Sequence, residues 1–295
     1  MSLIIAYLGP EGTYAESVAL AYAQWLRVQG EAVDTLVPYA SIPATLRAVS
    51  AGEATLAVVP IENSIHGSVA ISLDTLWQLE LPIRQALVLP ICHSLLSHAP
   101  ALTAIATVYS HPQALAQCQG WLERHLPQAQ LVAANSTTAV LRELAEETTA
   151  AAIASPRAAA LYQVPVLAAN LNDYPENHTR FWVTGGAAVT ADPGDLVSLA
   201  FSVPANVPGA LVAPLQVFAT RGINLSRIES RPTKRSLGEY LFFVDLAGCL
   251  NTPAMQSAIT ELAQHTEVLK IFGSYRVLNI RDGAIAVDAT APKVR

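Results

Sequence analysis

Residues 185–195 read GGAAVTADPGD, a run of small residues, Gly and Pro that separates two unlike patterns in the chain. This composition is typical of a linker between compact units. Before the run, short apolar stretches alternate with amphipathic ones of helical length. After it, strands and helices follow each other in a different order. We therefore expect a domain boundary here, with a catalytic or binding part before it and a linker at residues 187–195.

The part before the linker has the rhythm of an α/β protein. Strand, helix and strand in alternation favour α/β layers with mostly parallel sheets. We expect strands at residues 4–8, 55–60, 105–109, 130–134, 151–154 and 181–183, and helices at residues 15–29, 42–51, 68–79, 113–125 and 138–147.

The part after the linker predicts a ferredoxin-like unit at residues 196–280. Its elements follow the order βαββαβ, which is the ferredoxin-like arrangement. The tail at residues 281–295 has little apolar periodicity, so we expect it to be loosely held. The elements of the unit are expected at residues 196–203, 209–220, 223–231, 240–245, 253–265 and 268–277.

The composition indicates a folded cytoplasmic protein of two or three units. The 295 residues are 52% hydrophobic and 14% charged, which suits buried cores. A net charge of −6 without any basic run argues against binding nucleic acid. The N-terminal MSLIIAYLGPEG lacks the basic region of a signal peptide, and no apolar stretch approaches the roughly 20 residues of a membrane span. The three widely spaced cysteines, Cys92, Cys118 and Cys249, fit buried residues in a reduced compartment.

Polar side chains gather where the predicted strands end. The junctions read GPEGTYAE (9–16, with Thr13 and Glu16 as a capping box), IENSIHGS (61–68), SHPQ (110–113) and NSTT (135–138). In an open parallel sheet such strand ends and the following helix N-termini face one crevice. Helix N-termini bind anions without many cations, although N-capping alone explains several of these residues. Together the junctions predict a cleft for a small anionic ligand.

The stretch NHTRFWV at residues 177–183 sets four hydrogen-bonding side chains directly before three large apolar ones. It is typical either of a loop entering a strand or of a strand rim that holds a substrate. In the second interpretation Arg180 takes a carboxylate bidentately, Thr179 is a short donor, and Phe181 or Trp182 forms an apolar wall.

Cofactor and metal motifs are absent from the sequence. It contains no GxGxxG after a strand, no GxxxxGK[ST], no GxSxG and no pair of histidines at ligand spacing. We therefore expect chemistry without a bound cofactor and no metal site.

Five motifs make the chain resemble the prephenate dehydratases. GPEGTYAE, PIENSIHGSV, SHPQALAQC, NSTTAV and NHTRF stand in the family's order, and GALVAPLQVFATRGINLSRIESRPTK resembles the ACT regulatory domain of the same enzymes. The similarity runs from Leu8 to about Leu278. It implies a two-lobed catalytic domain like a periplasmic binding protein at residues 1–186, followed by the ACT domain. Lobe 1 is expected at about 1–80 and 165–186, and lobe 2 at about 81–164.

The resemblance implies a chemistry for this domain. Prephenate would lose CO2 and its ring hydroxyl to give phenylpyruvate and water, and ring aromatisation makes an electron-sink cofactor unnecessary. The family's essential threonine corresponds to Thr179, which we expect to hydrogen-bond the departing hydroxyl. Arg180 would hold a carboxylate and Phe181 would pack the site. His66 stands where the family more often has a carboxylate or small residue. The expected substrate contacts are Asn63, Ser64, Ser110, His111, Gln113 and Thr137.

The resemblance also implies regulation by L-phenylalanine. ACT domains pair and bind an amino acid at their interface, so a homodimer or dimer of dimers is expected; the simpler interpretation is a structural or dimerising domain. The expected L-phenylalanine contacts are Gly209, Ala210, Leu211, Asn224, Leu225, Glu229, Ser230, Arg231 and Pro232.

Three other functions fit the same sequence features. Arogenate dehydratase performs the same elimination on the amino-acid analogue, and the motifs do not separate the two. A non-catalytic amino-acid sensor would keep the cleft and the ACT domain, although the intact Thr179-Arg180-Phe181 argues against it. A transport binding protein is disfavoured because the sequence shows no signal peptide.

Overall fold

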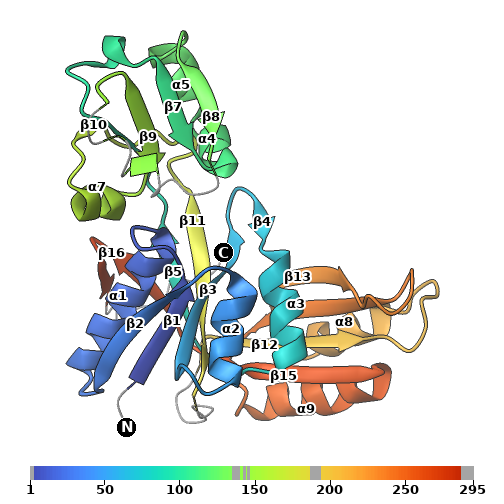
Figure 1. Ribbon diagram of the computed structural model, residues 1–295. Helices are drawn as coiled ribbons and strands as arrows, with labels where there is room; N and C mark the ends of the chain where they lie inside the picture. Colours follow the sequence, from blue (N-terminus) through green and yellow to red (C-terminus); the bar gives the residue numbers. More distant parts are fainter. Residues whose placement is uncertain (1–2, 135–139, 142–143, 145–146, 187–193, 287–295) are drawn as a thin grey trace.

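The computed structural model describes the chain except residues 1–2, 135–139, 142–143, 145–146, 187–193 and 287–295 (Figure 1). Three units are visible, each built on its own sheet. A first lobe carries both the second lobe and a C-terminal unit, and the latter lies beside α3 (Figure 1). These units confirm the predicted α/β fold followed by a ferredoxin-like domain.

The first lobe contains an eight-stranded sheet in the order β17-β16-β5-β11-β3-β1-β2, with β4 paired to β3. Strand β1 is parallel to β2 and β3, whereas β11 lies antiparallel between β3 and β5. Its elements are β1 (Leu3–Leu8), α1 (Tyr14–Val28), β2 (Val33–Tyr39), α2 (Ile42–Ser50), β3 (Leu56–Asn63), β4 (Gly67–Ser68), α3 (Ala70–Leu79), β5 (Ile83–Pro90), β11 (His178–Gly185), β16 (Val277–Arg281) and β17 (Ala284–Ala286).

The second lobe contains a five-stranded sheet in the order β10-β6-β9-β7-β8. Within it β7 is parallel to both β8 and β9, whereas β6 is antiparallel to both β9 and β10. Its elements are β6 (Ser94–Leu96), the 3-10 turn η1 (Leu102–Ala104), β7 (Thr107–Ser110), α4 (Pro112–Gln117), α5 (Gln119–His125), β8 (Gln130–Ala133), β9 (Ala150–Ala154), α7 (Pro156–Tyr162) and β10 (Val166–Ala168).

The C-terminal unit is a four-stranded antiparallel sheet in the order β13-β14-β12-β15, the strand order of a ferredoxin-like fold. Two helices pack on one face around Val217, Phe218 and Leu262. Its elements are β12 (Leu196–Ser202), α8 (Val212–Ala219), β13 (Leu225–Pro232), β14 (Tyr240–Ala247), α9 (Pro253–Leu262), the 3-10 turn η3 (Ala263–His265) and β15 (Val268–Tyr275).

Strand β11 holds the first lobe and the C-terminal unit together, because its two faces belong to different cores. Phe181 and Val183 pack on the α1 side of the sheet. Trp182 packs on the opposite side, in a cluster that includes Phe243 and Tyr275 of the C-terminal unit. The rings of Trp182 and Tyr275 meet edge-on with centroids 6.3 Å apart. A shared core of this kind predicts that the C-terminal unit is fixed to the first lobe.

Several predicted boundaries differ from the structure. The residues of β5 were expected in lobe 2, but the strand belongs to the sheet of lobe 1. The residues of β10 were expected in lobe 1, but the strand belongs to the sheet of lobe 2. The last predicted strand divides after Tyr275, and its second part leaves the C-terminal unit to pair with β5. The start of the tail is also fixed, because β17 pairs with β16 and buries Ile280 and Ile285 against α1.

The predicted helix at residues 113–125 is divided at Cys118 into α4 and α5. Most of the predicted helix at 138–147, the linker at 187–193 and the tail after 286 lie outside the described residues. Within the part of the chain that the structure describes, no helix combines the length and apolar character needed to cross a membrane.

Candidate active site at the junction of the two lobes

Asn63, the last residue of β3, is the centre of a polar network where the lobes meet. Its side-chain amide donates to Thr179 Oγ1 at 3.0 Å and to Asn177 Oδ1 at 2.7 Å. Its Oδ1 accepts from the backbone N–H groups of Ile65 and His66, both at 3.1 Å. Because the amide donates to Thr179 Oγ1, the threonine hydroxyl hydrogen is not used in this bond. The network therefore orients Thr179 as a donor.

The network continues into the second lobe through Gln117 at the end of α4. Gln117 Oε1 accepts from Asn177 Nδ2 at 3.0 Å and lies 2.8 Å from His93 Nε2. Gln117 Nε2 lies 2.9 Å from His66 Nδ1. Asn177, Gln117 and His93 are each less than 5% exposed. Hydrogen bonds that are shielded from water in this way hold their geometry well.

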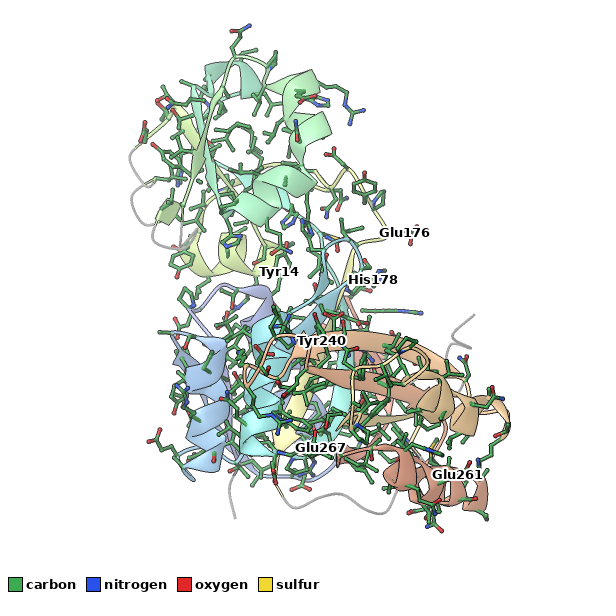
Figure 2. All side chains as sticks on the ribbon, turned by 90° about the vertical axis from the view of Figure 1, so that its right-hand side faces the viewer. Tyr14, Glu176, His178, Tyr240, Glu261 and Glu267 are labelled. Atoms are coloured by element: carbon green, nitrogen blue, oxygen red, sulfur yellow. The ribbon has the colours of Figure 1, made fainter. Side chains whose placement is uncertain are left out.

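His93 connects the network to Tyr14 at the start of α1, which lies with His178 at the level of the lobe junction (Figure 2). The Tyr14 hydroxyl lies 3.0 Å from His93 Nδ1 and 2.7 Å from the Cys92 carbonyl oxygen, two acceptors between which its single hydrogen is shared. Burial lowers the pKa of His93, although its bond to Gln117 acts in the opposite direction. Burial raises the pKa of Tyr14. Both rings are therefore neutral, and His93 donates from Nε2 to Gln117.

The neutral state of His93 leads to a prediction about stability and pH. Between the lowered pKa of folded His93 and the ordinary value of 6.5, the unfolded chain binds a proton that the folded chain does not. Stability is thus expected to fall as pH drops below 6.5, and His93→Gln should reduce this loss. Chemical unfolding at neutral and mildly acidic pH measures it, with His125→Gln at an exposed position as the control. Identical pH dependences of wild type and His93→Gln would contradict the prediction.

A second connection between the lobes forms at the loop after β1. Arg157 of α7 donates to both carboxylate oxygens of Glu16, at 3.0 and 3.1 Å, and Ser155 Oγ donates to the Gly12 carbonyl at 2.7 Å. The predicted capping box is half realised. Thr13 Oγ1 accepts from the Glu16 N–H, but the Glu16 carboxylate accepts from the N–H of Gly12 instead of Thr13.

The other predicted substrate contacts occupy three kinds of position. Ser64 is exposed and its hydroxyl accepts from the His178 N–H at 2.9 Å. Ser110 is fully buried and donates to the Ile153 carbonyl at 2.6 Å, so it ties two strands of the second lobe together. His111 caps α4 by accepting from the Gln113 N–H, and both side chains are exposed. Thr137 lies outside the described residues.

Two of the predicted catalytic residues point away from this network. Arg180 pairs with Glu62 and with Asp245 of β14, on the face of the sheet covered by the C-terminal unit. Phe181 is 2% exposed and packs in the core beneath α1. Consecutive residues of a strand face opposite sides, so Arg180 pairs with these carboxylates on the face opposite Thr179, and its expected role as a substrate ligand stays a prediction. Only Thr179 of the three meets Asn63.

Four residues of the network were not predicted from the sequence: Tyr14, His93, Gln117 and Asn177. Asn177 and Gln117 stand inside the motifs NHTRF and SHPQALAQC, so their side-chain types were a usable signal. His93 follows β5, a strand that ends at Pro90 and was not among the strands expected from the sequence. His66, which departs from the family's usual residue, is exposed and its Nδ1 lies 2.9 Å from Gln117 Nε2.

The residues predicted to bind L-phenylalanine divide between a turn and a strand. Gly209 has a φ of 82°, which favours glycine, and the helix starts at Val212 instead of at residue 209. In β13, Glu229 accepts from Ser68 Oγ at 3.0 Å, and Arg231 bonds both carboxylate oxygens of Asp74 at 3.0 and 3.1 Å. These two side chains thus contact the first lobe.

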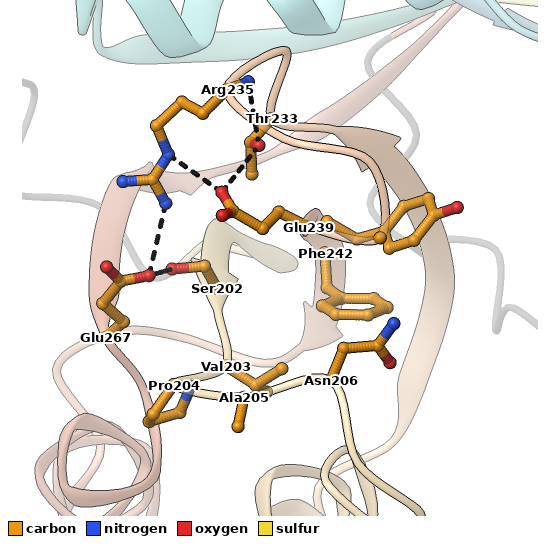
Figure 3. A pocket seen from close by; sticks show the side chains of 12 residues that line it. Ser202, Val203, Pro204, Ala205, Asn206, Thr233, Arg235, Glu239, Phe242 and Glu267 are labelled. Carbon is orange, nitrogen blue, oxygen red and sulfur yellow. Dashed lines mark hydrogen bonds and ion pairs between the residues drawn. The ribbon is translucent and has the colours of Figure 1, made fainter.

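The C-terminal unit also has a cavity of about 390 Å³ (Figure 3). Arg235 at its rim pairs with Glu239 at 3.2 Å and with Glu267 at 3.3 Å, and Ser202 donates to Glu267. The predicted L-phenylalanine contacts are all among the described residues, and none of them lines this cavity.

The fold and the network define a two-lobed α/β protein with a polar site at the lobe junction and a ferredoxin-like domain. The profile "PDT: Prephenate dehydratase" matches residues 5–188, and the profile "ACT domain" matches residues 197–264. The chain therefore belongs to the prephenate dehydratase family, whose members are carbon–oxygen lyases, and it carries an ACT domain.

Relatives of known identity agree with this assignment. The prephenate dehydratase of Mycobacterium sp. (strain JLS) is 41% identical over 278 residues, which cover 92% of this chain and 88% of the relative. The structure of prephenate dehydratase from Arthrobacter aurescens in complex with L-Phe has a TM-score of 0.82 at 34% identity, covering 98% of this chain and 94% of the other. A structure described as a quorum quenching acylase has a TM-score of 0.76 at 28% identity, covering 92% and 97%.

The similarity to the Arthrobacter structure extends over nearly the whole of both chains. It confirms the predicted fold class, a two-lobed α/β domain followed by an ACT domain.

Proposed function

We propose that this protein converts prephenate to phenylpyruvate, CO2 and water. The observation that carries the proposal is the hydrogen bond from Asn63 to Thr179, within a buried network that spans both lobes. It supports the predicted role because it leaves the Thr179 hydroxyl hydrogen available for the oxygen that departs from the substrate ring.

The reaction requires one proton and no redox partner. The electron pair of the bond to the ring carboxylate enters the ring, and the pair of the C–O bond leaves with the hydroxyl oxygen. The oxygen takes a proton to become water, so the prephenate dianion and one proton give the phenylpyruvate monoanion, CO2 and water. Donors fixed at the place where charge develops stabilise such a transition state, because they need no reorganisation during the reaction. Thr179, oriented by Asn63, is the donor in this proposal.

The amide-rich network suits this task better than a charged one. Asn63, Asn177, Gln117 and neutral His93 fix one another, and the buried part carries no net charge that would compete for the donor. The ring carboxylate, once removed from water, would be lost more readily.

Feedback inhibition by L-phenylalanine at the ACT domain is the second part of the proposal. The Arthrobacter relative was solved with L-Phe, and the ACT domain of this chain shares a core with the first lobe. Inhibition requires that the ligand bind an inactive arrangement more tightly than the active one. We place the protein in the cytoplasm as a homodimer or a dimer of dimers, the assembly expected of paired ACT domains.

The test is formation of phenylpyruvate from prephenate and of phenylalanine from arogenate, each with and without L-phenylalanine. We expect turnover of prephenate that L-phenylalanine suppresses. Turnover of arogenate alone would make the protein an arogenate dehydratase. If neither substrate is consumed, the reaction proposed here is wrong, and an amino-acid sensor or the acylase activity named for one structural relative becomes the function to test.

A further inference from the structure

Directly behind the site lies a group of four charged side chains, three of them 11% exposed or less, that the proposed reaction does not use. The register pairs Thr179 with Asn63 and Arg180 with Glu62 on the neighbouring strand. Since side chains alternate between the faces of a sheet, Arg180 and Glu62 both point toward the ACT domain. Each is the direct sequence neighbour of a network residue. The group consists of Glu62, Arg180, Arg227 and Asp245.

Arg180 forms ion pairs with two carboxylates on this face. Its Nη2 lies 2.5 Å from Asp245 Oδ2, and its Nε lies 3.1 Å from Glu62 Oε1. Its side chain is 11% exposed. Burial alone would lower the pKa of Arg180, but Asp245, Tyr275 and Glu62 outweigh it and raise the pKa, so the guanidinium stays charged. Arg180 thus holds β11 to an acidic residue of the ACT domain.

Asp245 is held in turn by the other strands of the ACT sheet. Its side chain is 1% exposed, and Oδ1 accepts from Ser198 Oγ of β12 at 2.5 Å. Ser198 Oγ also lies 2.5 Å from the Tyr275 hydroxyl of β15. Tyr275 meets Trp182, two residues after Arg180, edge-on. Three ACT strands therefore fix the segment of β11 that carries Thr179.

Arg227 of β13 makes a parallel connection to the strand that carries Asn63. Its Nε lies 2.8 Å from Glu62 Oε2, and its Nη2 donates to Ser68 Oγ at 2.9 Å. Ser68 donates in turn to Glu229 Oε2 at 3.0 Å. Strand β13, which carries the predicted L-phenylalanine contacts Glu229 to Pro232, is thus bonded to the β3–β4 hairpin next to Asn63.

We propose that Arg180 is a positioning residue through which the ACT domain sets the placement of Thr179. A ligand that shifts β13 and β14 relative to β3 and β11 changes the Arg180–Asp245 and Arg227–Glu62 pairs, and Thr179 and Asn63 move with them. This proposal rests on the proposed dehydratase function. It replaces the expectation that Arg180 binds substrate, and it predicts an effect of Asp245, which lies in a different domain.

The test compares Asp245→Asn, Ser198→Ala and Arg180→Lys with the control Asp74→Asn. Asp74 of α3 pairs with Arg231 and Lys234 of the ACT domain, so its loss removes an interface ion pair elsewhere than at β3 and β11. Ser198→Ala loosens Asp245 without leaving a buried charge unpaired, which guards against failure of Asp245→Asn to fold. The readouts are kcat and KM for prephenate, half-inhibition by L-phenylalanine, and hydrogen–deuterium exchange of residues 177–181.

We expect Asp245→Asn to lower kcat about 10- to 100-fold, as small misplacements of catalytic groups do. Its KM should change less than about threefold, because no substrate contact is lost. Exchange at residues 177–181 should rise and sensitivity to L-phenylalanine should fall. Ser198→Ala should act in the same direction, more weakly, and Asp74→Asn should match wild type in kcat and exchange.

Three results would overturn the proposal. The first is wild-type kcat and exchange in both Asp245→Asn and Ser198→Ala. The second is unchanged inhibition by L-phenylalanine in Asp245→Asn. The third is an Arg180→Lys variant with a raised KM and an unchanged kcat, the signature of a substrate ligand. If wild type forms no phenylpyruvate, the proposed function fails, and exchange at residues 177–181 still decides whether the ACT domain positions β11.

Discussion

Thr179→Val is expected to lower kcat/KM for prephenate at least about 100-fold, the usual effect of removing one transition-state donor. Valine keeps the branched shape of threonine and removes only the hydroxyl. The Asn63 amide would lose an acceptor, but the strand pairing with Asn63 and Leu89 would be retained. The loss should therefore appear in kcat, with a smaller change in KM.

The same strand offers a matched control. Thr184 is fully buried in β11, and within the described residues its hydroxyl has no hydrogen-bond partner. Thr184→Val is the same chemical change, so it measures what loss of a threonine hydroxyl from β11 does to activity when the hydroxyl lies outside the site. Steady-state rates and circular dichroism of both variants make the comparison. Full activity of a folded Thr179→Val would show that Thr179 is an ordinary strand residue and that the site lies elsewhere.

The fold was predictable where a local pattern carries it. The predicted first strand and first helix coincide with β1 and α1 within one or two residues, because apolar periodicity and the Thr13 cap mark them. Strands β5 and β16 show why other boundaries were missed. They lie 187 or more residues apart in sequence yet pair in one sheet, so their common position follows from tertiary contacts that no local pattern records.

The site was predictable only in part, for the same reason. Asn63 and Thr179 were named from motifs, and the structure joins them across 116 residues of sequence. Arg180 was expected in the same site as Thr179, although alternation along a strand places neighbours on opposite faces. The sequence shows that Arg180 is a cation, but it does not show which anion it pairs with. That anion is Asp245, which belongs to the ACT domain and is 65 residues away in sequence.

Asn63→Asp is expected to be the most informative change at the centre of the network. It keeps the size of the side chain and the acceptor for the N–H groups of Ile65 and His66, but it replaces the donating amide with oxygen. That oxygen would repel Asn177 Oδ1, and it would accept the Thr179 hydroxyl hydrogen, which is then no longer available to the substrate. We expect kcat/KM to fall about 100-fold or more, because Thr179 loses the group that orients it.

The pH dependence of this variant separates orientation from general damage. Asn63 is 7% exposed, so burial and the neighbouring Asn177 Oδ1 would raise the pKa of a carboxyl introduced there, against the two backbone N–H groups that lower it. When protonated it can donate again through its O–H, and the activity of Asn63→Asp relative to wild type should therefore increase as pH falls. Asn206→Asp, at an exposed position of the ACT domain, adds the same charge as a control. The measurement is kcat/KM of Asn63→Asp divided by that of wild type, from neutral to mildly acidic pH. If this ratio does not change with pH, Asn63 supports the fold and does not orient Thr179.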